Sequence, residues 1–316
     1  MGIIDTLTAG YDLVRRRLWL LVLPLVLDIG LWLAPKLSVF TLLRGLWRTL
    51  LANAAASGVA TSTLLGNANE ILPDLAAMAR ELDLAVLLPL SSLGVPVLPM
   101  TGTTSFFGLT KQAIELQGGL ALLLVMASLV LGGLFIGAAY MALIAHIVRD
   151  GQVHWRELVR QVPRYWLRLI GAGLLLLAGI MIVALPASMI ISLFGLFSPT
   201  LASLLMGLLS FFVFWMMIYM VFVPQAIVFS HDGALKSIWR SAIMVRTSFW
   251  PALGLFLLSY VITTGLAFVW DFLTVSAPGA LVAMVASAFV GTGLTAALFV
   301  FYRERLRALA GVAPHA

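Results

Sequence analysis

The chain has 316 residues, of which 62% are hydrophobic and only 10% are charged. A soluble domain is nearer half apolar and a quarter charged, so the composition excludes an ordinary soluble protein and favours lipid as the surrounding medium. The net charge of +6 comes from basic residues that lie beside apolar stretches, which favours anionic lipid headgroups, and not nucleic acid, as the partner.

Residues 1–17 are expected to form a cytoplasmic interfacial helix that leads into the first apolar stretch. Their arginines resemble the start of a signal peptide, but Asp28 interrupts the apolar run and no small-residue cleavage site follows it. Six stretches are apolar enough to cross about 30 Å of hydrocarbon. They are residues 18–34, 120–147, 167–190, 203–229, 251–273 and 280–302, so the sequence predicts an all-α integral membrane protein with six transmembrane helices.

Residues 35–119 form a long apolar segment between the first two stretches, and we interpret it as an extracytoplasmic insertion. Apolar residues recur at helical spacing over 40–51, which predicts an amphipathic helix on the outer leaflet. A second helix is expected after Pro73. Residues 87–100 contain three prolines and are expected to form an apolar loop that folds back on the protein's own helices; contact with lipid or with a partner membrane protein is the alternative.

Basic residues are distributed unequally between the two sides of the membrane that these stretches define. Fourteen of the 19 Lys and Arg residues fall at the two termini or in segments 148–168 and 236–246, and the other five lie in 35–119. The positive-inside rule then places both termini in the cytoplasm. We expect a multi-pass protein of a bacterial plasma (inner) membrane.

The stretches HWRELVRQVPRYW and SIWRSAIMVRTSFW each run directly into an apolar stretch, with Trp and Arg at matching intervals. With a looser match at the N-terminus, they predict three units in a single membrane domain, 1–316, each an interfacial helix followed by a two-span hairpin. Two of these units occupy residues 148–310. The alternative is convergence, because any cytoplasmic interface is enriched in these residue types.

Three arginines recur at four-residue spacing before the third apolar stretch and therefore share one face of a helix. We expect the repeated inner helices to lie in the plane of the inner leaflet and to gather anionic phospholipid, each cation contributing about 1 kcal/mol. The alternative is that the arginines only set topology. The candidate lipid-interface residues are Trp155, Arg156, Arg160, Arg164, Trp166, Lys236, Trp239, Arg240 and Trp250.

The stretch VFVPQAIVFSHDGALKSIWRSAIMVRTSFWPALG resembles the core of bacterial membrane proteins related to the glycerophosphodiester phosphodiesterase membrane-domain family. Pro224, Ala234, Leu235, Trp239 and Trp250 carry the likeness, which covers residues 150–310. In that family the membrane part is a helical module that is sometimes fused to a separate catalytic domain. The resemblance therefore implies a fold and not an activity.

Asp28 is the candidate functional residue inside the membrane. It lies about 15 Å into the first apolar stretch by helical rise, near mid-bilayer. Ionisable groups at this depth usually face the bundle interior and often mark a pathway for ions or solutes. The alternative is a structural carboxyl that accepts a hydrogen bond from a tyrosine or serine of a neighbouring helix, or one that lies near a thinned outer interface.

Other patterns are interpreted structurally. His146 is expected to be a solvated interfacial histidine, with a role as proton acceptor or ligand as the alternative. The HDG stretch at 231–233 is interpreted as a turn, and Gly133-x-x-x-Gly137 as a close helix contact. The glycine pattern at 291–296 lies inside an apolar stretch, so it is not a dinucleotide site.

No constellation of residues defines a catalytic, cofactor or metal site. The chain has no cysteine, which excludes disulfides and thiolate chemistry. We therefore expect a non-enzymatic integral membrane module, a scaffold or accessory subunit that organises membrane lipids or partner membrane proteins. The alternative is a transporter or channel for a small solute that uses Asp28.

Overall fold

The computed structural model describes residues 2–56, 83–98, 112–116, 118–309 and 311. Within them, five helical stretches are long and apolar enough to cross a membrane. They are α6 (Gly119–Asp150), α7 (Trp155–Gly195), α8 and α9 taken together (Pro199–Met220 and Val223–Phe229), α11 (Phe249–Leu273) and α12 (Ala277–Leu309). The remaining elements are α1 (Ile3–Arg15), η1 (Leu18–Leu21), α2 (Val22–Leu33), β1 (Lys36–Ser38), α3 (Phe40–Ala56), η2 (Leu84–Val86), α5 (Leu87–Ser91), β2 (Ala113–Glu115) and α10 (Ala234–Thr247). The chain is therefore an all-α, multi-pass membrane protein, which confirms the expected fold class at this level.

The first apolar stretch is shorter than the other five. It consists of the 3-10 turn η1 followed by α2, which together cover Leu18–Leu33. Pro24 is the third residue of α2 and lies in its first turn, where a missing N–H breaks no helical hydrogen bond. This proline therefore does not kink the helix. The 12 residues of α2 span about 18 Å, less than the roughly 30 Å of a hydrocarbon core. The sixth crossing and the threefold repeat accordingly stay predictions.

α7 differs from the expected interfacial helix followed by a separate span. It is one continuous helix of 41 residues, which contains both Pro163 and Pro186. The basic residues at its start are good helix formers, so nothing ends the helix before the apolar run begins. In contrast, α1 and α10 are separate helices that end before η1 and α11. Of the three expected units, the first and last therefore have a distinct helix before the apolar stretch, and the middle one does not.

The apolar stretch expected over residues 203–229 is broken into two helices, α8 and α9. The helix is interrupted at Val221 and Phe222, and Pro224 lies in the first turn of α9. The Ser241 hydroxyl, from α10, donates to the Tyr219 carbonyl at 2.6 Å and accepts from the Phe222 N–H at 3.2 Å. One neighbouring side chain thus satisfies both a carbonyl and an N–H at the break, as an interrupted helix requires at membrane depth.

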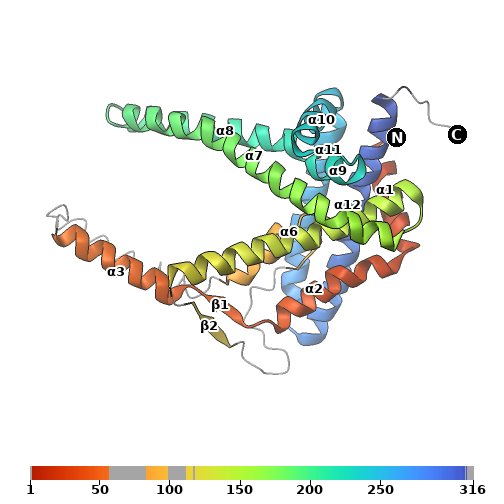
Figure 1. Cartoon of the computed structure of the whole chain (residues 1–316), viewed down its shortest axis with the longest axis horizontal. Helices are drawn as coiled ribbons and strands as arrows, with labels where there is room; N and C mark the ends of the chain where they lie inside the picture. Colours follow the sequence, from red (N-terminus) through yellow and green to blue (C-terminus); the bar gives the residue numbers. More distant parts are fainter. Residues whose placement is uncertain (1, 57–82, 99–111, 117, 310, 312–316) are drawn as a thin grey trace.

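The core lies where the second halves of α6 and α12 meet α9. Its largest fully buried side chains include Tyr140, Ile144, Phe222, Phe299 and Tyr302. In Figure 1, α7 and α8 run together as an arm away from this core, while the start of α1 and the end of α12 lie near each other on the opposite side. Most apolar side chains of the arm are exposed, which fits a surface that faces lipid.

A short parallel pair of strands closes the base of the insertion, with Leu37 of β1 opposite Ile114 of β2. Asp83 ties this pair to η2, because its carboxylate accepts from the N–H groups of Leu37 and Ala85, each at 3.0 Å. α3 follows β1 and forms the first helix expected in the insertion. The helix expected after Pro73 lies outside the described residues.

Residues 84–98, which we call the inserted segment, fold back against the protein's own helices, as expected. The segment contains η2, the short helix α5 and an extended stretch, so the prediction of a loop over 87–100 is wrong for α5. Gly94 has a φ of +75°, a left-handed conformation that favours glycine, and its carbonyl accepts from Thr295 Oγ1 of α12 at 2.8 Å. Non-helical backbone is tolerated at membrane depth where protein encloses it.

Glycines on α6 and α12 leave the room for the inserted segment. A Cβ atom on Gly137 would lie 2.7 Å from the Leu93 backbone nitrogen, and Gly133 makes similar room one turn earlier on α6. On α12, a Cβ atom on Gly291 would lie 2.1 Å from Pro96 Cβ. The Gly133-x-x-x-Gly137 pattern therefore makes the expected close helix contact, since Gly133 meets the short helix α5, while Gly137 receives the extended stretch that follows it.

Candidate functional site

Asp28 is buried, with 1% of its surface exposed. Its Oδ1 accepts a hydrogen bond of 2.9 Å from the backbone N–H of Leu98, in the inserted segment. Its Oδ2 has no hydrogen-bond partner among the residues that the structure describes. The partner is thus a backbone group and not the tyrosine or serine of the alternative interpretation. The carboxyl satisfies an N–H that would otherwise be unpaired inside the bundle.

A long apolar groove runs along α2, between this helix, α6 and the start of α7. Its volume is about 770 Å³. Val26, Gly30 and Ala34 line it at four-residue spacing, so one face of α2 forms its wall. At one end of α2 the rings of Trp19 and Trp155 lie 5.8 Å apart, and both line the groove. The lining is almost entirely apolar, which fits a hydrocarbon chain better than a polar solute.

The three arginines at the start of α7, Arg156, Arg160 and Arg164, are exposed. Arg156 directly follows Trp155, which lines the groove, and the exposure of all three arginines fits the expected contact with lipid headgroups. Trp166, a further candidate, has a different role in the structure. Its indole nitrogen donates to the Leu131 carbonyl at 3.0 Å, so this side chain joins α7 to α6.

The candidate residues on α10 lie apart from the groove. Lys236 Nζ forms an ion pair with the buried carboxylate of Asp232 at 3.2 Å, and Arg240 pairs with the other oxygen of the same carboxylate. Trp239 and Trp250 are 69% and 78% exposed, as expected for side chains at an interface. Lys236 and Arg240, two of the three basic residues of α10, are therefore engaged by a carboxylate.

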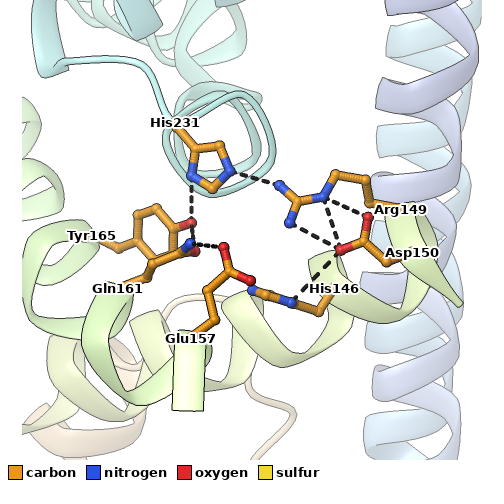
Figure 2. A network of polar contacts seen from close by, with 7 residues as sticks. All are labelled: His146, Arg149, Asp150, Glu157, Gln161, Tyr165 and His231. Atoms are coloured by element: carbon orange, nitrogen blue, oxygen red, sulfur yellow. Dashed lines mark hydrogen bonds and ion pairs between the residues drawn. The ribbon is translucent and has the colours of Figure 1, made fainter. Parts of the chain in front are cut away.

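A network of polar side chains links the ends of α6 and α9 to the start of α7 (Figure 2). Arg149 Nη1 lies 2.6 Å from His231 Nε2 and donates to it, so Nδ1 carries the proton of the neutral ring. Nδ1 lies 2.6 Å from the Tyr165 hydroxyl and donates to it. Tyr165 donates to Gln161, and Gln161 Nε2 donates to Glu157 Oε1 at 2.7 Å. Each group donates to the next, so the hydrogen bonds of this chain all run in one direction.

Acidification should weaken this network at His231. Desolvation, and then the positive charges of Arg149 and Arg168, hold the pKa of His231 below its ordinary value of about 6.5. As pH falls, the unfolded chain therefore binds the proton first, so the stability contributed by neutral His231 is complete above about pH 6.5 and is lost below it. Unfolding midpoints measured between about pH 7.5 and pH 5 should fall more steeply for the wild type than for His231→Gln. Parallel curves would contradict this prediction.

Two arginines counted among the topology charges close the end of α6. Arg17 donates to the Gly151 carbonyl, and Arg303 donates to the Val148 carbonyl at 2.9 Å. The last carbonyls of a helix lack helical partners and carry partial negative charge, so cations stabilise them. Sequence spacing alone could not reveal these contacts, because they join α6 to residues 134 and 155 positions away.

The interpretation of His146 as a solvated interfacial histidine is wrong. Its side chain is only 2% exposed because the second half of α6 faces the core. Within the described part of the chain, neither ring nitrogen has a hydrogen-bond partner. The four-residue spacing of His146 and Asp150 was the signal in the sequence that these two side chains lie together, since it places both on one helix face. The HDG stretch at 231–233 is the expected turn, between α9 and α10.

Comparisons of the chain with family models, with curated proteins and with solved structures found no match in any of the three. The resemblance to the glycerophosphodiester phosphodiesterase membrane-domain family therefore stays a prediction, based on the residues at 221–254. The chemistry of the chain has to be derived from its own geometry.

Proposed function

We propose that the chain is a non-enzymatic membrane module that holds an acyl chain of an anionic phospholipid in the groove along α2. As a scaffold or accessory subunit, it would thereby organise lipid around partner membrane proteins. The groove carries this proposal, because it combines an apolar lining with exposed basic residues and a tryptophan pair at one end.

The dimensions of the groove support an acyl chain as the occupant. The wall formed by α2 is about 18 Å long, and one leaflet contributes roughly 15 Å to the hydrocarbon core. Tryptophan rings prefer the headgroup level, where Trp19 and Trp155 would flank the glycerol region. Arg16 lies three residues before Trp19, and Arg156 directly follows Trp155; both arginines are exposed. An anionic headgroup at this end would therefore find positive charge.

The proposal places the protein in a bacterial plasma membrane, with six crossings and both termini in the cytoplasm. The excess of basic residues at the termini and at 148–168 and 236–246 supports this orientation. The proximity of the start of α1 and the end of α12 in Figure 1 also supports it, because an even number of crossings returns a chain to its starting side. Local thinning of the bilayer would accommodate the short α2.

Filling the groove tests the proposal. A Cβ atom on Gly30 would meet nothing within 4 Å, so Gly30→Leu projects into the groove without displacing protein atoms, and leucine also favours the helix. Each buried methylene is worth about 0.8 kcal/mol, so excluding about two of them should lower lipid affinity roughly tenfold. Phosphatidylglycerol retained by the purified protein, measured by native mass spectrometry, reports this loss.

Gly132→Leu is the matched control, because Gly132 is also a helical glycine with open space around its Cβ position and does not line the groove. Replacing Arg16 and Arg156 by glutamine should lower the preference for phosphatidylglycerol over phosphatidylcholine while the groove still holds lipid. Equal lipid retention by Gly30→Leu and the wild type would refute the groove as the binding site.

The alternative, a transporter that uses Asp28, receives less support from the geometry. Asp28 Oδ1 holds the Leu98 N–H of the inserted segment, which gives this carboxyl a structural task. Its second oxygen, unpaired among the described residues, is the observation that favours transport. Uptake that is lost in Asp28→Asn, with the fold intact, would establish the alternative.

A further inference from the structure

We propose that His146, Asp150 and His154 form a binding site for a divalent transition-metal ion such as Zn²⁺. This inference does not depend on the proposed lipid site. Two imidazoles and one carboxylate are a donor set that suits Zn²⁺, Fe²⁺ and related ions, and the chain has no cysteine to compete for them.

The three side chains converge at the turn between α6 and α7. One ligand atom of each lies within 4.8 Å of the others, and His146 Nδ1 lies 3.8 Å from Asp150 Oδ2. Bonds of about 2.0–2.2 Å place the ligand atoms of one ion roughly 3–3.6 Å apart, so a small closure is needed. His154 can supply it, because it is exposed in the turn and its side chain does not cap α7.

The buried histidine is the second observation that indicates a ligand. His146 is 2% exposed, yet neither of its ring nitrogens has a hydrogen-bond partner in the described residues. Buried polar groups are nearly always paired, so an imidazole without a partner points to a missing one. A cation fits as the missing partner, because the carboxylate of Asp150 faces the ring at 3.8 Å and would share the ion with it.

The surrounding charges are compatible with an added cation. Arg149 donates to both oxygens of Asp150, from Nε at 3.0 and 3.1 Å and from Nη2 at 3.0 Å. Carboxylates that bind metals commonly accept such hydrogen bonds from an outer shell, which orient them. Arg149 is itself held by His231, since its Nη1 lies 2.6 Å from His231 Nε2.

An ion at this site would join the last turns of α6 to the residue that precedes α7. With three protein ligands, at least one coordination position would stay open toward the exposed side of the turn. The site would then fix the geometry of the α6–α7 turn and of Trp155, the first residue of α7.

Metal binding by the full chain, purified without a histidine tag and dialysed against Zn²⁺, tests the proposal. One Zn²⁺ per chain is expected, and excess Mg²⁺ should not displace it, because Mg²⁺ prefers oxygen ligands. His154→Ala and Asp150→Asn should each lower the affinity by at least about 100-fold. His315→Ala removes a histidine that is not one of the three proposed ligands and should bind Zn²⁺ as the wild type does.

Thermal unfolding gives a second measurement. Zn²⁺ should raise the unfolding midpoint of the wild type and of His315→Ala, and should leave that of His154→Ala unchanged. His154 is exposed, so its alanine variant should fold as the wild type does without metal, which gel filtration checks. The proposal is overturned if the wild type fails to bind Zn²⁺ stoichiometrically, or if His154→Ala and Asp150→Asn both keep wild-type affinity.

Discussion

Replacing Gly137 by alanine should destabilise the protein by about 1–3 kcal/mol, the usual range for overpacking a filled site. The new methyl carbon would lie 2.7 Å from the Leu93 backbone nitrogen and 3.1 Å from the Leu93 carbonyl oxygen. Backbone atoms cannot yield as the end of a flexible side chain can, so the inserted segment must move away from α6. The midpoint of thermal unfolding in detergent should fall accordingly.

Gly132→Ala on the same helix should change stability in the opposite direction. A Cβ atom at Gly132 meets nothing within 4 Å, so alanine adds no clash and gains about 0.5–1 kcal/mol from its higher helix propensity. Each variant adds one methyl group to the wild type, so the difference between their stabilities isolates the contact with the inserted segment. A stabilised Gly137→Ala would mean that the segment does not rest on α6.

Replacing Asp28 by leucine should release the inserted segment, whereas Asp28→Asn should retain it. Asparagine keeps an acceptor oxygen for the Leu98 N–H, which lies 2.9 Å from Asp28 Oδ1. Leucine offers none, and a buried N–H without an acceptor costs about 1–3 kcal/mol. The leucine variant should therefore be less stable than the asparagine variant by about this amount.

Cysteine labelling can follow the segment directly, because the native chain has no cysteine. A cysteine introduced at Val97, next to the bonded N–H, should react slowly with a maleimide in the wild-type and Asp28→Asn backgrounds. It should react faster in the Asp28→Leu background. Equal rates in all three would show that the Asp28 carboxyl does not hold the segment in place.

The sequence was sufficient to predict the structure where one physical signal dominated. The length and apolarity of five stretches predicted five helices long enough to span, because an apolar run of about 20 residues is rare outside membrane-spanning helices. The apolar stretch at 203–229 did not predict the break into α8 and α9, which Ser241 stabilises from another helix. Asp28 was recognised as buried and polar, while its partner Leu98 lies 70 residues away.

The polar network shows why the rest could not be predicted. His146 and His231 are ordinary surface residues by sequence, and only the packing of α6 against α9 buries the first and brings the second to Arg149. The prediction of a boundary within α7 was wrong for a different reason. The expected boundary between an arginine-rich helix and an apolar helix is a change in environment, and such a change does not require a change in backbone conformation.

The contact between Asp83 and the Leu37 N–H has a consequence for how this protein can evolve. This hydrogen bond holds Leu37 and Asp83 close together, whatever the length of the chain that connects them. The entropy of closing a loop grows only with the logarithm of its length, and each doubling adds about 0.6 kcal/mol. Lengthening the chain between α3 and Asp83 should therefore cost the rest of the fold little in loop-closure entropy. This stretch is where homologues should vary most in length, and where a foreign domain could be grafted.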